Sequence, residues 1–350
     1  MSGDGLPLSF LDLVRSKDRQ LVATVKSDAA RLSSLGVGPG FVDLDAIPTS
    51  YPMLANSRLD EIIADYSKRH GISREFTRDI LRQHQKALIA SELRDLARRY
   101  QVLLSFTLGG HRIFRIAPGL ASRLLNTQVD VPSAALRAPF ESILLLFDDQ
   151  ATIGAFNLGR PFRSASAKGT VSAFVTEVDS PKGRRFTATS FHTRGLHRYG
   201  TYSRSFDCER GTVEEMLECN WDQPADRSCA PEYGRDFHRL LLNCLLYMGS
   251  RAARVRTAAE TSARTRGVAW SASHVVVGDG LSPLSNSASG PARAGTRGSA
   301  TNLLRRQLVI GHWRQHAVGA GRAERKLIWI EPYWRGPELG DAVNRVRLVR

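Results

Sequence analysis

The sequence predicts an α+β fold, with a helical N-terminal region followed by an antiparallel or mixed sheet and a buried helix. Three observations favour this class. Apolar residues recur at helical spacing after residue 56, β-rich runs follow residue 140, and residues 240–248 form the apolar stretch LLLNCLLYM. A hydrophobic content of 42% is enough for a substantial core. No apolar run is long enough for a membrane span, and the first residues lack a signal-peptide pattern, so we expect a cytoplasmic protein without membrane contact.

Shifts in composition divide the chain into five segments. They are a partly disordered leader (1–54), a helical region with a hairpin (55–128), an α+β core (129–280), a flexible low-complexity insertion (281–302) and a basic, tryptophan-rich hairpin that completes the core (303–350). Within the α+β core we expect a buried strand at ILLLF, a hairpin over 170–192 around SPKG, and another strand in HVVVGDG.

The helical region contains a candidate DNA-binding motif. Asn56 is a suitable cap for a first helix that ends at Gly71, and Ser73 opens a second helix that reaches about residue 99. Residues 100–116 follow as a predicted hairpin, with a Gly-Gly turn. Two helices and a hairpin resemble a winged helix, which makes a DNA-binding transcriptional regulator one alternative. The other interpretation is that the helices pack on each other and on the hairpin.

Positive charge is concentrated at the C-terminal end. The chain has a net charge of +15, and residues 251–350 carry 17 Lys+Arg against 6 Asp+Glu, a net of +11. A localised basic region attracts polyanions, so RNA or the ribosome is the expected partner, with DNA possible. Only 7 of the 49 basic residues are lysine, so a general arginine bias contributes as well.

The four cysteines do not indicate a disulfide scaffold or a metal centre. Cys208, Cys219, Cys229 and Cys244 contain no CxxC pair, and structural zinc sites usually use closely spaced pairs of ligands. We therefore expect reduced thiols, no metal and no cofactor.

Residues 311–336 hold the densest chemistry in the chain. Apolar runs on both sides of Gly319 and Gly321 predict two strands joined by a basic loop. Period-two alternation places Ile328 and Ile330 on one face, which we expect to meet the core. Trp329 and Glu331 would then lie on the opposite face, where we expect a groove.

Three interpretations of this segment stay open. In the first, arginines and Lys326 contact phosphates while tryptophans stack on unpaired bases. In the second, His312 or His316 acts with Glu331 as an acid–base pair of an RNA-cleaving enzyme. In the third, the tryptophans are core residues and the arginines are solvated. We favour recognition over catalysis, because no further catalytic motif supports an enzyme. The expected binding residues are Trp313, Arg314, Gly319, Gly321, Arg322, Arg325, Lys326, Trp329 and Trp334.

The spacing of this segment is similar to a known signature. Gly311-His312-Trp313, then Gly319-x-Gly321 after five residues and Pro332 after ten more, resembles the C-terminal motif of the type V-A anti-CRISPR family and its relatives in phages, plasmids and other mobile elements. The order of the upstream elements is also similar, so the resemblance covers residues 55–335.

The resemblance implies a regulatory or counter-defence protein. Such a protein recognises a target polypeptide through its nascent N-terminal peptide during translation, and lowers the level of the encoding message. The arginine-rich loop departs from the family pattern, which leaves the identity of the target open.

Overall fold

The computed structural model describes residues 19–39, 50–84, 86–147, 171–180, 183–194, 198–208, 211–218, 231–250, 253–257, 274–281, 284, 306–335 and 342–343. The helices are α2 (Arg19–Ser34), α3 (Ser50–His70), α4 (Arg74–His84), α5 (Lys86–Leu108), α6 (Pro118–Leu125), α8 (Val213–Glu218) and α9 (Pro231–Gly249). The strands are β1 (Arg112–Ile116), β2 (Thr127–Gln128), β3 (Ser142–Phe147), β4 (Val171–Ser180), β5 (Gly183–Arg194), β6 (Arg198–Asp207), β7 (Val255–Thr257), β8 (His274–Val277), β9 (Arg306–Val309), β10 (Gly311–Val318), β11 (Glu324–Ile330), β12 (Tyr333–Arg335) and β13 (Ala342–Val343).

The central element is a seven-stranded mixed sheet, in the order β6-β5-β4-β3-β1-β8-β7. Strand β1 runs parallel to both β3 and β8, and the other neighbours are antiparallel. The predicted strand ILLLF, the hairpin around SPKG and the strand in HVVVGDG are confirmed as β3, β4–β5 and β8. The α+β class is confirmed with them.

Helices cover both faces of this sheet. Ile143, Leu145 and Phe147 of β3 pack in one cluster with α6 and α9. Leu144 and Leu146 of the same strand pack in a second cluster with α2 and α5. Because alternate side chains of a strand point to opposite faces, a strand that is covered on both sides must be apolar throughout. The predicted buried helix is α9, and its residues from Leu240 to Tyr247 are all buried.

The expected leader contains an ordered part. Helix α2 buries Leu21 and Val25 completely against the second cluster, and the Tyr100 hydroxyl of α5 donates a hydrogen bond to the buried Asp28 carboxylate. Residues 19–34 of the leader thus form an ordered helix, because the apolar stripe on α2 completes the packing of α5. Residues 1–18 and 40–49 lie outside the described part of the chain.

The helix boundaries around residue 71 are partly as expected. Gly71 follows the end of α3 with φ of +66°, a conformation that favours glycine, and the Ser73 hydroxyl accepts a hydrogen bond of 3.2 Å from the amide of Phe76. Both predictions are confirmed. Asn56 does not begin a helix, because α3 starts earlier, at Ser50, and Asn56 lies inside it.

The hairpin predicted over residues 100–116 is not present. Helix α5 continues to Leu108, with Tyr100, Leu103 and Leu104 buried at helical spacing, and Gly109–Gly110 connects this helix to β1. A short apolar run fits a buried helix as well as a strand, which explains the error. The winged-helix interpretation lacks the hairpin that would form the wing, because β1 pairs with parallel strands inside the central sheet.

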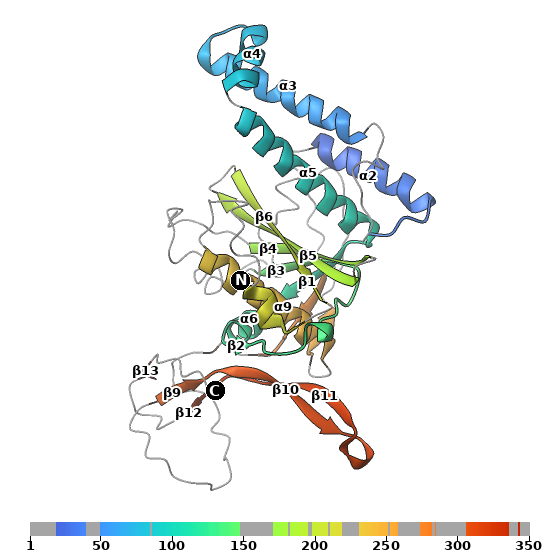
Figure 1. The fold of residues 1–350 in the computed structure, drawn as a ribbon, viewed down its shortest axis with the longest axis vertical. Coiled ribbons are helices and arrows are strands. Elements are labelled where there is room, and N and C mark those ends of the chain that lie inside the picture. Colours follow the sequence, from blue (N-terminus) through green and yellow to red (C-terminus); the bar gives the residue numbers. More distant parts are fainter. Residues whose placement is uncertain are drawn as a thin grey trace, which may run out of the picture.

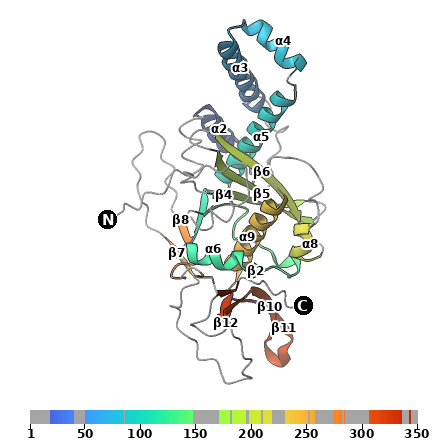
Figure 2. The same ribbon diagram turned by 90° about the vertical axis from the view of Figure 1, so that its left-hand side faces the viewer.

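Two extensions leave the central body at opposite ends. Helices α3 and α4 extend beyond one end of the sheet, and the β10–β11 hairpin projects at the other (Figure 1). The same arrangement is visible after a quarter turn (Figure 2). The predicted insertion, residues 281–302, lies outside the described residues except for Leu281 and Leu284. No helix in the described ranges is long and apolar enough to cross a membrane.

Candidate recognition surface on the C-terminal hairpin

Strands β10 and β11 form the hairpin that the sequence predicts. They pair antiparallel, with Trp313 opposite Trp329 and His316 opposite Lys326. Gly319 and Gly321 have φ angles of +80° and +64° in the connecting turn, so both occupy the conformation that favours glycine. The glycine-bearing loop is thus confirmed.

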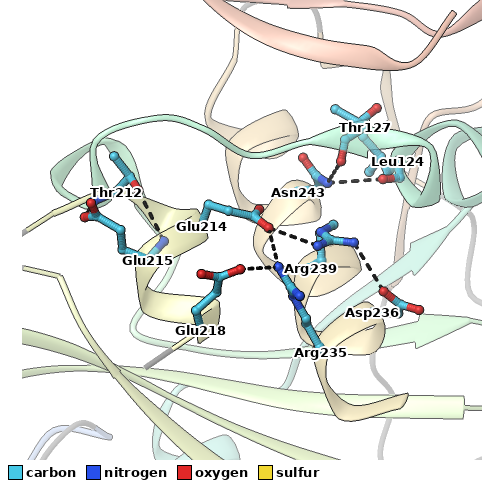
Figure 3. Close-up of polar contacts among 10 residues, drawn as sticks. All are labelled: Leu124, Thr127, Thr212, Glu214, Glu215, Glu218, Arg235, Asp236, Arg239 and Asn243. Carbon is cyan, nitrogen blue, oxygen red and sulfur yellow. Dashed lines mark hydrogen bonds and ion pairs between the residues drawn. The ribbon is translucent and has the colours of Figure 1, made fainter. Parts of the chain in front are cut away.

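Asn243 anchors the base of this hairpin from α9. Its side-chain nitrogen donates hydrogen bonds of 3.1 Å to the carbonyl of Leu124 and 3.0 Å to the carbonyl of Thr127 (Figure 3). Its side-chain oxygen accepts a bond of 2.8 Å from the indole nitrogen of Trp313. Asn243 is completely buried, and an amide in the interior is stable only when its donors and acceptors are satisfied.

The two tryptophans of the hairpin point into the protein. Trp313 is only 6% exposed and belongs to the core cluster of α6 and α9. The Trp329 ring stacks beside it at 6.2 Å, meets Tyr247 edge-on at 5.2 Å, and donates a hydrogen bond of 3.3 Å to the Thr127 hydroxyl. Trp334 lies on β12 opposite Leu308 and is partly buried. The hairpin indoles therefore pack against the core, and Trp313 is too buried to stack on a base.

The expectation that Ile328 and Ile330 face the core is wrong. Leu327 and Trp329 are the β11 residues that pack against the core cluster, so the two isoleucines lie on the outward face. Both faces of this strand carry large apolar side chains, and the two indole donors bond to acceptors on the side of Thr127 and Asn243. That pairing decides which face is buried.

The glycine and proline of the signature make close packing possible at the base. The amide of Gly311 donates a hydrogen bond of 2.8 Å to the carbonyl of Asn126. A Cβ atom at this position would lie 2.6 Å from the Thr127 hydroxyl and 2.7 Å from Pro332 Cδ. Any side chain larger than hydrogen would separate β10 from β2, so the signature describes a joint between hairpin and core.

Beyond this joint the hairpin carries exposed cations. On β10, His312, Arg314 and His316 share the outward face and are exposed. Arg322 and Arg325 at the tip are also exposed, and Lys326 is partly exposed. Across the described part of the chain, no acidic side chain forms an ion pair with Arg314, Arg322, Arg325 or Lys326. Their field is therefore available to a polyanion.

The candidate acid–base residues are not brought together. The Glu331 carboxylate is held at 2.7 Å by the guanidinium of Arg123 on α6. His312 lies opposite Ile330 on the outward face, and no hydrogen bond joins it to Glu331. No group of three or more potential metal ligands gathers among the described residues. Cys208 and Cys244 are buried, whereas Cys219 and Cys229 lie outside the described part.

Sequence reasoning missed the residues that position the hairpin. Asn243 is a single polar residue within an apolar helix, which is a usable signal because such residues are kept for their hydrogen bonds. Arg123 and Thr127 carry no comparable signal. Nearby, Arg235 and Arg239 of α9 bind Glu214 of α8 at 2.9 and 3.0 Å, which fixes α8 on α9 (Figure 3).

Comparison with known proteins now identifies the family. The model of the AcrVA2-like family, described as the anti-CRISPR type V subtype A2 family, matches residues 114–337. The chain belongs to this family. The matched region runs from β1 to just beyond β12, so it contains the anchored hairpin and excludes α2 to α5.

The crystal structure of AcrVA2 is similar with a TM-score of 0.47 and 10% identity, covering 92% of this chain and 95% of that chain. No curated protein matches. Family membership confirms the resemblance of the GHW…GxG…P signature and makes the chain a counter-defence protein of the anti-CRISPR kind.

Proposed function

We propose that this anti-CRISPR family member recognises a target polypeptide and lowers its expression, while its basic hairpin contacts RNA or the ribosome. The observation that carries the proposal is the combination of an anchored base and a cationic tip. Asn243, Thr127 and Pro332 hold the base, and the arginines beyond it have no described acidic partner. A rigid support lowers the entropy cost of placing these charges against a partner.

The side chains of the hairpin favour phosphate contact over base recognition. Arginine presents a planar fork that donates two hydrogen bonds to a phosphate group. The indoles that could have stacked on bases are turned inward and hydrogen-bonded. We therefore expect binding to RNA that depends strongly on salt and little on sequence.

Arg314 and Arg322 provide the test of this RNA contact. The double variant Arg314→Ala/Arg322→Ala should weaken binding to a 20-nucleotide polyuridine. It should also reduce the slope of log K against log salt by about 1.4, since each phosphate contact on a single strand contributes about 0.7. The control is Arg19→Ala/Arg74→Ala, which removes the same charge from exposed sites on α2 and α4.

The cellular readout is a crosslinking pull-down of the complete chain. Enrichment of RNA or ribosomes that falls in the hairpin variant and persists in the control supports the proposal. An unchanged salt slope, or a stronger preference for duplex DNA of equal length, contradicts it and favours a DNA-binding regulator.

A further inference from the structure

No strand in the described part of the chain lies against the outer edge of β11. Within the described ranges its seven residues, Glu324–Ile330, pair with β10 alone. Strand β2 covers the other side of β10 only at Gly311 and His312, so most of the hairpin is a two-stranded ribbon. An open edge leaves a row of backbone donors and acceptors without ladder partners, and a two-stranded ribbon is marginally stable alone. This geometry suits the addition of another strand.

The side chains along β11 change character from tip to base. Exposed Glu324 begins the strand at the tip, Arg325 and Lys326 come next, and Leu327, Ile328 and Ile330 follow toward the base. The three apolar residues are partly buried, so each keeps some accessible surface. Neighbouring strands place side chains on the same face within about 5 Å of each other. An added strand would therefore meet cations at one end and aliphatic surface at the other.

We propose that an extended segment of the target polypeptide adds as a strand to the outer edge of β11. Its acidic side chains lie beside Arg325 and Lys326, and its aliphatic side chains lie beside Ile328 and Ile330. Backbone hydrogen bonds supply affinity, and the alternate side chains supply selectivity, as in other cases of strand addition. The inference rests on the proposed recognition of a polypeptide and specifies where and how that recognition occurs.

Two comparisons favour this occupant and this edge. Among the described residues, the edge of β10 beyond His312 presents the exposed polar residues Arg314, Gln315 and His316. Its apolar end consists of Ala317 and Val318, so it lacks the larger aliphatic surface of β11. RNA would satisfy the cations of β11 but leave its isoleucines and its open backbone without partners. An extended peptide with one acidic and one aliphatic end would contact the cations, cover the isoleucines and pair with the open backbone of β11.

The test begins with selection of a random nine-residue peptide library on the complete chain. We expect enriched peptides that combine aliphatic residues in alternation with an acidic end. Hydrogen exchange with one such peptide should then slow at those amides of residues 324–330 that face away from β10. Backbone N-methylation of that peptide should abolish binding, because it removes the ladder donors.

Charge reversal distinguishes this contact from general stickiness. Arg325→Glu/Lys326→Glu should weaken the selected acidic peptide by about tenfold or more and restore binding to its lysine-substituted counterpart. The matched control, Arg19→Glu/Arg74→Glu, changes charge equally at two exposed helix starts, where an acid is tolerated.

The outcomes separate the two proposals. If the selected peptides slow hydrogen exchange in another segment instead of β11, the β11 site is wrong, but the proposal that the protein recognises a polypeptide still stands. If no peptide is enriched over an unrelated bait, the cations of β11 act only to prevent edge-to-edge aggregation, and the inference fails. RNA binding by Arg314 and Arg322 is measured independently and is not altered by either result.

Discussion

The indole nitrogen of Trp313 and the side-chain oxygen of Asn243 lie 2.8 Å apart, although 70 positions separate the residues in the chain. This hydrogen bond joins the C-terminal hairpin to the buried helix α9. Because Asn243 also holds the carbonyls of Leu124 and Thr127, one amide side chain connects α6, β2, α9 and β10. The position of the cationic tip depends on this connection.

Removal of the Asn243 amide should destabilise the protein and release the hairpin. Asn243→Ala leaves the Trp313 indole donor unsatisfied in the interior and removes one hydrogen bond from each of two carbonyls. An unsatisfied buried group costs about 1–3 kcal/mol, and each lost hydrogen bond costs about 1 kcal/mol more. We expect the free energy of unfolding to fall by about 3 kcal/mol or more, measured by urea denaturation. Asn56→Ala is the matched control, because Asn56 is exposed within α3 and its replacement should be nearly neutral. Equal effects of the two variants would refute the anchoring role.

Gly311→Ala should disturb the joint without removing any hydrogen-bonding side chain. The added methyl group would approach the Thr127 hydroxyl and the Pro332 ring closer than van der Waals contact allows. We expect a loss of about 1–3 kcal/mol and faster hydrogen exchange across β10 and β11, as for other overpacked sites. Gly249→Ala is the control, since nothing lies within 4 Å of the added atom. Unchanged exchange in β10 would contradict this account of the signature glycine.

Substitution of the candidate acid–base residues should leave activity intact. Glu331 is held by Arg123 in a partly exposed ion pair, and such pairs contribute about 1 kcal/mol or less. We expect Glu331→Gln and His312→Ala to cause little loss of stability and to preserve the lowering of target message in cells. Quantitative measurement of that message checks the prediction. If either variant folds normally but the target message returns to the level seen in cells without the protein, the result would instead support an RNA-cleaving enzyme.

Stability should decline in alkaline solution through Cys208. Burial raises the pKa of this thiol from 9.0 to about 12. Below pH 9 both native and unfolded chains keep the proton, so this contribution is fully present. Between pH 9 and 12 only the unfolded chain releases it, and stability falls by up to about 1.4 kcal/mol per pH unit.

The Cys208→Ala variant isolates this contribution from other alkaline titrations. The difference in unfolding free energy between wild type and variant should be constant below pH 9 and should shrink above it. Urea denaturation at several values of pH measures the difference. A difference that stays constant up to pH 11 would show that the thiol is not protected by burial.

Local sequence patterns predicted much of the central fold. A continuous aliphatic run predicted β3, a turn sequence between two β-rich runs predicted β4–β5, and the apolar content of residues 240–248 predicted the buried helix α9. The errors occurred where the pattern was ambiguous or weak. Residues 100–108 fit a strand or a helix, and α2 gains its order from packing on α5.

For the hairpin, the sequence by itself determined the two strands, the glycine turn, the basic character and the family resemblance. Each of these follows from alternation, backbone freedom or composition within a short stretch. Only the tertiary structure decided that Trp313 and Trp329 turn inward and the isoleucines outward. Alternation is equally apolar on both faces of β11, so the choice depends on Asn243 and Thr127, which lie 70 and 202 positions from their indole partners.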